Sequence, residues 1–351
     1  MADDGRAPSE LIALFEAIRQ APDAFNFFPA LRRIEAKTPA RPRLGHSRRP
    51  AEDALRLGQT PSMIFAPSAI SALEPAGETS PARLETYFFG LLGPNGPMPL
   101  HLTDYARNRL RNAADPTFAR FLDLFHHRMA SLFFRAWAAA EPTVSHDRPE
   151  QDQFATQLGS LMGLGFASLR GRDAMPDLAK LHFAGRFAAP ARNPEGLRAI
   201  LGSFFDVPVA LHEFIPQWIE LPTNALCRLG ESRETGTLGT TATAGGRIRL
   251  YHHKFRIVLG PLSLTDYERL LPGGGSLARL VPAVRNYVGD ELAWDLNLVL
   301  RRDEVPPTRL GMAGKLGWTS WIGTRRSPRD AGDLTLNPFF SLAKTRSTTH
   351  G

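Results

Sequence analysis

Apolar residues recur at three- and four-residue steps between Asp115 and Ala140, and this spacing predicts one long helix. Asp115 suits the N-cap, and Pro116 suits the first helical position, where its missing N–H costs nothing. At 1.5 Å per residue the helix would be about 35 to 40 Å long. Its apolar positions would form one broad face that needs burial: Phe118, Phe121, Leu122, Phe125, Met129, Leu132, Phe133 and Ala136.

The period changes farther along the chain. Residues 207–221 mix β-branched and aromatic residues with prolines, which predicts short, interrupted strands. Residues 291–300 alternate, with leucines and Trp294 toward one side and Asp295 and Asn297 toward the other, as in a strand over a core. Helical patterns precede that strand near residues 264–271 and 276–288, divided by a glycine-rich loop.

These patterns predict an α+β protein that is elongated and loop-rich. We expect long helices in the N-terminal half, suited to a shared helical bundle, and mixed short strands and helices in the C-terminal half. The 29 prolines and 30 glycines follow no period and indicate many turns. Four segments are predicted: an N-terminal helix and basic, proline-rich arm, a helical region with a Gly/Pro loop and the long helix, a mixed α/β region, and a flexible tail (1–52, 53–145, 146–325 and 326–351).

Cysteine content and hydropathy favour a cytoplasmic location. The single cysteine, Cys227, has no second cysteine with which to form a disulfide or a thiolate metal site. The apolar stretch at residues 11–20 is too short and too charged for a signal peptide. No segment approaches the roughly 18 uninterrupted apolar residues of a membrane span, so we expect any membrane contact to be indirect.

The formal charge of +7 raises the possibility of nucleic-acid binding. Residues 31–50 contain seven Lys or Arg and one acid, Glu35. Such a patch suits phosphate, but prolines interrupt it and aromatic stacking residues are lacking. We favour a basic arm lying on an acidic protein partner and keep nucleic acid as an alternative.

The candidate catalytic and metal-binding groups are few. Asp123 and His127 are one helical turn apart, a spacing that suits a metal, but no third ligand is evident nearby. We interpret Asp123, His126 and His127 as polar groups that are satisfied where the helix packs. No nucleotide-binding loop, nucleophile elbow or redox cysteine pair is recognisable, so we expect no catalytic residue, metal, cofactor or small-molecule substrate, and an uncharacterised enzyme is the less favoured alternative.

Six blocks in the same order resemble the TssG family of the bacterial type VI secretion apparatus, over nearly the whole chain. The most specific are GLLGPNGP at residues 90–97 and LGWTSW at residues 316–321. The others begin at RLGHSRRP, FARFLDLFHHR, FFDVPVALHEF and FRIVLGPLSLTDYERLL. Two departures are Phe134, where a tyrosine is expected in the family, and the tail after Pro338, which matches nothing.

The resemblance implies a non-enzymatic structural subunit of the baseplate wedge. Such a subunit binds TssF and helps recruit TssK beneath the contractile sheath and tube, at the cytoplasmic face of the inner membrane. Its further expected partners are the sheath or tube and other baseplate components, and it would reach the membrane only through the membrane complex. We expect the long helix to pack against TssF.

We expect partner contacts on the long helix, on the Gly/Pro loop and at two tryptophans. The loop could equally be a rigid connector and the tryptophans core residues. The predicted contacts are Gly93, Pro94, Asn95, Gly96, Pro97, Phe121, Phe125, Phe133, Trp137, Trp318 and Trp321.

Overall fold

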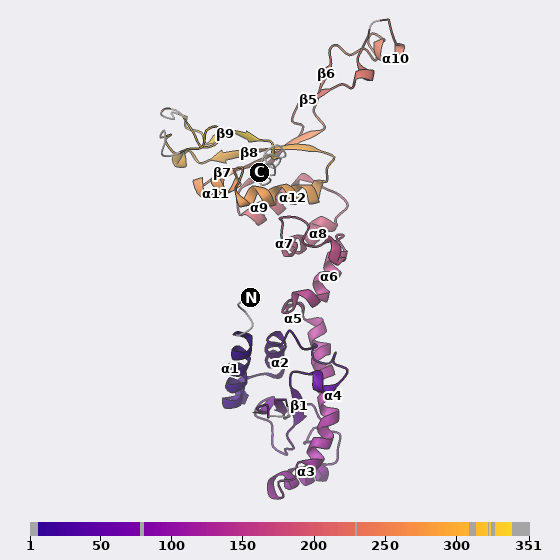
Figure 1. The fold of residues 1–351 in the computed structure, drawn as a ribbon, viewed down its shortest axis with the longest axis vertical. Helices are drawn as coiled ribbons and strands as arrows, with labels where there is room; N and C mark the ends of the chain where they lie inside the picture. The colour runs from indigo at the N-terminus through magenta and orange to yellow at the C-terminus, as the bar shows by residue number, and fades with distance from the viewer. Residues whose placement is uncertain are drawn as a thin grey trace, which may run out of the picture. The chain divides into compact units, whose positions relative to one another are not determined.

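A computed structural model describes residues 6–77, 81–228, 230–308, 314–321, 323 and 327–338 of the chain. The chain divides into two compact units, Met1–Thr156 and Gln157–Gly351, each with its own apolar core. Helices and several small mixed sheets make up both units (Figure 1), which confirms the predicted α+β class.

The N-terminal unit packs helices against a small three-stranded sheet. Helices α1 (Arg6–Gln20) and α2 (Phe27–Ala36) precede strands β1 (Arg56–Gln59), β2 (Ile70–Glu74) and β3 (Arg83–Thr86). The strand order is β1-β3-β2, with β1 parallel and β2 antiparallel to β3. The main core includes the buried residues Phe27, Leu31, Ile34, Leu57, Leu84 and Phe134.

Two further helices and a short helical turn complete the unit. Helix α3 (Leu100–Asn112) leads into the 24-residue helix α4 (Thr117–Ala140), and α5 (Pro142–His146) follows. The long helix is therefore confirmed. It begins after Pro116, and Asp115 Oδ1 accepts hydrogen bonds from the Thr117 backbone N–H at 3.0 Å and its hydroxyl at 2.6 Å.

The sheet β1–β3 adds to the sequence interpretation, which has residues 53–145 as a helical region with a Gly/Pro loop and the long helix and predicts no strands there. Its strands are only four or five residues long, so each has too few positions to show an alternating pattern. Leu57 and Leu84 bury their side chains, and the glycine and charged residues beside them hide the strand signal.

The C-terminal unit is a mixed four-stranded sheet with helices on one face. Strands β4 (Val209–His212), β7 (Lys254–Leu262), β8 (Ala293–Leu300) and β9 (Ala331–Leu336) lie side by side in that order. The central pair β7 and β8 is parallel, and the two outer pairs are antiparallel. Figure 1 shows α9 (Pro194–Phe205), α11 (Leu264–Leu270) and α12 (Gly275–Val288) together against this sheet.

The core of this unit lies between the sheet and these helices. Trp294, Leu296, Leu298 and Leu300 of β8 are all buried, which confirms the alternation seen in the sequence. Asp295 is buried as well, and it pairs with Arg256 Nε at 2.6 Å, a partner that the sequence pattern does not indicate. Short helices precede the sheet: α6 (Gln153–Ser160), which begins before the unit boundary, α7 (Asp177–His182) and α8 (Ala184–Ala188).

A two-stranded ribbon continues the outer pair of the sheet. Strand β5 (Gln217–Glu220) pairs antiparallel with β6 (Arg247–Leu250), and the short helix α10 (Arg233–Gly236) lies between them in sequence. The prediction of short, interrupted strands over residues 207–221 is confirmed by β4 and β5.

The expected flexible tail at residues 326–351 needs a partial correction. Strand β9 forms there and adds an antiparallel edge to β8, with Ala331 and Leu336 buried on the core. Residues 339–351 lie outside the described part of the chain.

Candidate partner-binding surface

Helix α4 buries a face of small and polar residues rather than its aromatic stripe. Its buried residues are Ala119, Leu122, Asp123, His126, His127, Ala130, Ser131 and Phe134. Phe121 and Phe125 lie on the opposite side and are 54% and 52% exposed. The N-terminal unit therefore leaves most of the predicted apolar face uncovered.

The polar face of α4 packs against the edge strand β1 and satisfies its backbone. The Leu57 N–H donates to His127 Nδ1 at 3.1 Å, and the Gln59 N–H donates to Asp123 Oδ1 at 3.0 Å. Gly58 permits this approach, since a Cβ there would lie 2.9 Å from Asp123 Oδ2. An edge strand normally exposes such N–H groups, and here a helix supplies the missing acceptors.

The same contacts fix the tautomers of both histidines. His126 Nε2 accepts from the Leu91 N–H at 2.9 Å, so Nδ1 carries the proton and donates to Asp123 Oδ1 at 3.2 Å. His127 accepts at Nδ1, so Nε2 donates to Asp53 Oδ2 at 2.8 Å. The interpretation of these groups as satisfied packing residues is confirmed.

Asp123 is the centre of a buried charged cluster. Arg83 Nη1 lies 2.7 Å and Arg120 Nη1 lies 3.3 Å from Asp123 Oδ2. Burial raises the pKa of Asp123, but hydrogen bonds from His126 and the Gln59 N–H and the nearby Arg83 charge outweigh it. The net pKa lies below the ordinary value, and Asp123 is ionised at neutral pH.

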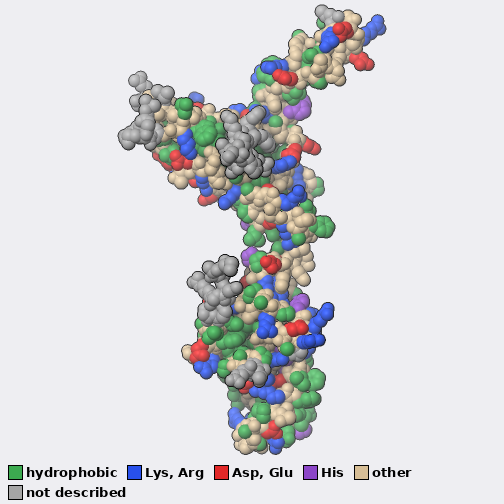
Figure 2. Space-filling model, in the orientation of Figure 1, with side chains coloured by type: hydrophobic (Ala, Val, Ile, Leu, Met, Phe, Trp, Pro, Cys, Tyr) green, Lys and Arg blue, Asp and Glu red, His purple; other side chains and the backbone are tan. Residues whose placement is uncertain are grey.

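The exposed side of α4 carries apolar residues toward its N-terminal end and arginines toward its C-terminal end. Phe121 and Phe125 contact each other edge to face, with ring centroids 5.7 Å apart, and Leu124 beside them is 68% exposed. Arg128 and Arg135 follow on the same side. Figure 2 shows hydrophobic side chains along this part of α4, with basic side chains farther along. We call Phe121, Leu124, Phe125, Arg128, Leu132 and Arg135 the outer face of α4.

Phe133 and Trp137 lie on the flank of the helix instead. Phe133 stacks on Phe89 with centroids 4.4 Å apart, and Trp137 stacks on Phe28 at 4.8 Å. Phe133 is 37% exposed, and Trp137 is half-buried against the N-terminal core. These two predicted contact residues therefore belong to an aromatic cluster separate from the outer face of α4.

The loop at residues 93–97 is a hydrogen-bonded turn with an exposed tip. The Gly96 N–H donates to the Gly93 carbonyl at 3.1 Å, with Pro94 and Asn95 between them. Gly93 is buried with φ of 100°, a value that favours glycine, and its N–H donates to Thr103 Oγ1 at 3.0 Å. Pro94, Asn95 and Pro97 are exposed. The loop thus combines an internally fixed base with side chains that a partner can reach.

Trp318 and Trp321 pack on the C-terminal core and are partly buried. The Trp321 indole N–H donates to Asp333 Oδ2 at 2.9 Å, and the Tyr267 hydroxyl donates to the Trp318 carbonyl at 3.1 Å. Burial raises the pKa of Tyr267 to about 12. Both tryptophans have internal partners as well as some exposed surface.

Part of the basic segment 31–50 holds the N-terminal unit together. Arg32 Nε pairs with Asp147 at 2.6 Å, and Arg43 Nη1 pairs with the buried Glu35 at 3.1 Å. Arg48 and Arg49 are exposed and make no ion pair within the described ranges. The segment is therefore divided into structural arginines and accessible ones.

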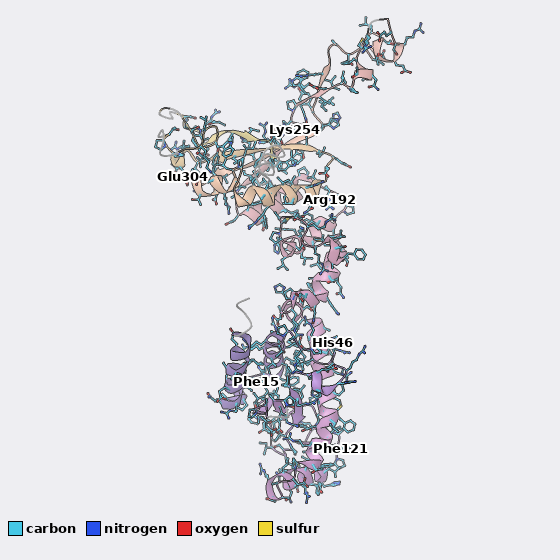
Figure 3. All side chains as sticks on the ribbon, in the orientation of Figure 1. Phe15, His46, Phe121, Arg192, Lys254 and Glu304 are labelled. Atoms are coloured by element: carbon cyan, nitrogen blue, oxygen red, sulfur yellow. The ribbon has the colours of Figure 1, made fainter. Side chains whose placement is uncertain are left out.

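A cavity of about 480 Å³ beside α4 was not predicted from the sequence. Arg48, Arg128 and Arg135 line it together with His46 and Asp53, and we call it the arginine cavity. In Figure 3 the label of His46, a loop residue, lies beside the part of α4 above the label of Phe121, which belongs to α4 itself. The only sequence signal is the seven-residue spacing of Arg128 and Arg135, which places both on one helix face. Arg48 comes from a loop that is far from α4 in the sequence.

The described part of the chain contains neither a cluster of metal-ligating side chains nor a membrane-spanning helix. No three or more His, Cys, Asp or Glu side chains there are placed to hold a metal ion. None of the helices within the described ranges combines the length and apolarity that a bilayer crossing requires.

Comparison with known proteins places the chain in a family. The family model described as "Type VI secretion, TssG" matches residues 21–323. No curated protein sequence matches. The fold resembles a chain of a TssK-TssF-TssG baseplate subcomplex of the type VI secretion system solved by cryo-electron microscopy. That match has a TM-score of 0.52 and 22% identity, over 62% of this chain and 90% of that one.

A chain of the type VI secretion baseplate complex is similar over more of its length. Its TM-score is 0.66 at 22% identity, and the match covers 95% of this chain and 94% of that one. At this identity the structural likeness supports the fold, whereas the family match spans most of the sequence. The chain belongs to the TssG family of type VI secretion.

Proposed function

We propose that this chain is a non-catalytic structural subunit of the type VI secretion baseplate wedge. It binds TssF and helps recruit TssK beneath the contractile sheath and tube, at the cytoplasmic face of the inner membrane. The observation that carries the proposal is the TssG family match over residues 21–323. The similar solved chains come from baseplate assemblies, one of which includes TssK and TssF.

The outer face of α4 is the proposed contact with TssF. Phe121, Leu124 and Phe125 expose a contiguous apolar surface on a rigid helix. Exposed aromatic residues that adjoin one another are typical of interfaces, because their burial contributes much of the binding free energy. A helix from TssF would cover them by packing its ridges into the grooves of α4.

Three further partner contacts are proposed. Pro94, Asn95 and Pro97 form an exposed tip that binding would not have to order, because hydrogen bonds already fix the turn. Phe133 and Trp137 on the helix flank, and Trp318 and Trp321 in the C-terminal unit, remain predicted partner contacts through their exposed edges.

Co-expression with TssF and affinity capture at low salt test the proposal. We expect the wild-type chain to retain TssF, and Phe121→Glu combined with Phe125→Glu to lose most of it, because two charges would face an apolar partner surface. The matched control is Leu238→Glu, which adds one charge at a residue that is 93% exposed elsewhere.

Failure of the wild-type chain to capture TssF at low salt would contradict the proposal. Turnover of a small molecule by the purified chain would contradict its non-catalytic part.

A further inference from the structure

The arginine cavity concentrates positive charge that the described residues leave without a carboxylate counter-charge. Arg128 Nη1 and Arg135 Nη1 donate to the Gly45 carbonyl, at 3.5 Å and 2.8 Å. Within the described ranges, neither they nor Arg48 form an ion pair with a carboxylate. A carbonyl is a weak counterpart for a guanidinium, which prefers a carboxylate or phosphate.

Among the described residues that line the cavity, Asp53 is the acidic side chain, and one of its carboxylate oxygens is already hydrogen-bonded. Asp53 Oδ2 accepts from His127 Nε2 at 2.8 Å, and Asp53 is buried. Burial and the neighbouring Arg135 charge lower the pKa of His46 at the cavity wall. The cavity therefore presents a net positive potential to a ligand that arrives from solvent.

Apolar surface adjoins this charge on the same helix. Leu124 lines the arginine cavity, and Phe121 and Phe125 continue the outer face toward the N-terminal end of α4. At 1.5 Å per residue, Arg128 lies only about 4.5 Å along the axis from Phe125, whereas Arg135 lies about 21 Å from Phe121. The outer face of α4 thus has an apolar half and a cationic half that adjoin each other, with midpoints roughly two to three helical turns apart.

We infer that the outer face of α4 receives an acidic amphipathic helix of TssF. The apolar side chains of that helix would cover Phe121, Leu124 and Phe125, and its carboxylates would enter the arginine cavity. The inference deepens the proposed function and rests on it. Each guanidinium can hold an Asp or Glu side chain by two parallel hydrogen bonds, so the cavity sets which register of the partner helix fits.

Charge complementarity together with the apolar half favours a protein helix over nucleic acid. Phosphates would pair with the arginines, but a duplex backbone offers nothing apolar to cover Leu124, which is 68% exposed. A helix with both kinds of residue would cover both halves at once.

The main test reverses the charge of the cavity. Arg48→Glu, Arg128→Glu and Arg135→Glu are combined, and the dissociation constant for TssF is measured at low and high salt. We expect affinity to fall on the order of tenfold or more and its salt dependence to weaken, since close interfacial charge pairs are lost. The matched control reverses Arg111, Arg172 and Arg198, three exposed arginines that make no ion pair in the described part of the chain.

A second probe separates this inference from the proposed function. It is a synthetic helical peptide with leucines at three- and four-residue spacing and glutamates two to three turns along, compared with a version carrying lysines in place of glutamates. The inference is supported if the wild-type chain binds the glutamate peptide but not the lysine peptide, and if the triple Arg→Glu variant no longer binds the glutamate peptide. This result would hold even if TssF is not captured. Arg128→Glu alone, which removes only one long hydrogen bond, provides a variant that keeps the fold, as circular dichroism would verify.

Several outcomes would overturn the inference. One is TssF binding that is equally tight and equally salt-dependent with and without the cavity reversal, while the wild-type complex forms normally. Another is failure of the glutamate peptide to bind better than the lysine peptide. A third is duplex DNA binding that the reversal abolishes while TssF capture is unchanged, which would assign the arginines to nucleic acid.

Discussion

Asp123 connects three parts of the N-terminal unit through one side chain. Its carboxylate accepts hydrogen bonds from the Gln59 backbone N–H of β1 and from His126 Nδ1–H, and it pairs with Arg83 of β3. A carboxylate with several donors is strongly stabilised in its charged form. The ion pair in the core therefore depends on the ionisation of this one group.

Asp123→Asn should lower the free energy of unfolding of the N-terminal unit by about 1–3 kcal/mol, because the buried carboxylate that pairs with Arg83 and Arg120 is lost. The loss stays within this range because water still reaches both arginines. The lowered pKa also sets the pH dependence. Near and below the ordinary pKa of 3.8, the Asp123 carboxyl group binds a proton in the unfolded chain but stays ionised in the folded one. The stability that Asp123 contributes is therefore present above pH 3.8 and is lost as pH falls through the lower pKa of the folded state.

Urea unfolding from neutral to acidic pH checks both effects. The exposed pair Asp104–Arg107 provides the control, and Asp104→Asn should change stability by less than about 0.5 kcal/mol. An Asp123→Asn variant whose acid sensitivity matches the wild type would contradict this account.

His46 reports on the potential at the arginine cavity. Burial lowers its pKa first, and the Arg135 charge lowers it further, with Arg43 adding to this and Glu35 opposing it. Arg135→Ala should therefore raise the pKa of His46, as measured from its imidazole resonances by NMR titration. Arg172→Ala is the control and should leave it unchanged, and an unchanged pKa in both variants would show that Arg135 does not set the potential there.

Helix α4 shows what hydrophobic periodicity could and could not predict. Its existence and length followed from the spacing of Phe118 through Ala136, and Pro116 marked its start. The buried side did not follow, because apart from Leu122 and Phe134 it is built from Ala, Ser, Asp and His residues, of which Asp123 and His127 bond to a strand edge. A pattern that counts apolar residues assigns such a face to solvent.

The sheet and the cavity were missed for a related physical reason. Strands β1, β2 and β3 owe their stability to pairings between residues far apart in sequence and to acceptors supplied by α4. The arginine cavity likewise joins Arg48 to Arg128 and Arg135 only after folding. Longer, self-contained patterns such as β8, α11 and α12 were predictable, since one segment carries the whole signal.

In the turn at residues 93–97, substitutions at the packed base and at the exposed tip should affect stability differently. A Cβ on Gly96 would lie 2.6 Å from the Leu91 carbonyl oxygen and 2.7 Å from that of Leu92, so the backbone must shift. Gly96→Ala should destabilise the N-terminal unit by about 1–3 kcal/mol in thermal unfolding. Asn95→Ala at the exposed tip should stay within about 0.5 kcal/mol of the wild type.

The same pair of variants separates a rigid connector from a partner contact. If the tip binds a partner, Asn95→Ala lowers capture of TssF or TssK while stability is unchanged. Normal capture of both partners by Asn95→Ala would leave the turn with a connecting role alone.

For the whole molecule, the two units have apolar cores that share no residue. The N-terminal core includes Leu84, and the C-terminal core includes Leu296, both with no exposed surface. Cavities left by large-to-small substitutions destabilise the core that contains them. Two separate cores should therefore respond independently to such changes.

Leu84→Ala and Leu296→Ala should each cost about 2–5 kcal/mol in their own unit and little in the other. Hydrogen exchange followed by mass spectrometry measures this directly, because peptides from residues 1–156 and 157–351 report local opening of each unit. We expect Leu84→Ala to accelerate exchange in β1, β3 and α4 while β7 and β8 keep wild-type protection, and Leu296→Ala to do the reverse. Faster exchange throughout the chain in either variant would mean that the units unfold as one cooperative body, and partner-binding defects from core substitutions could then not be assigned to one unit.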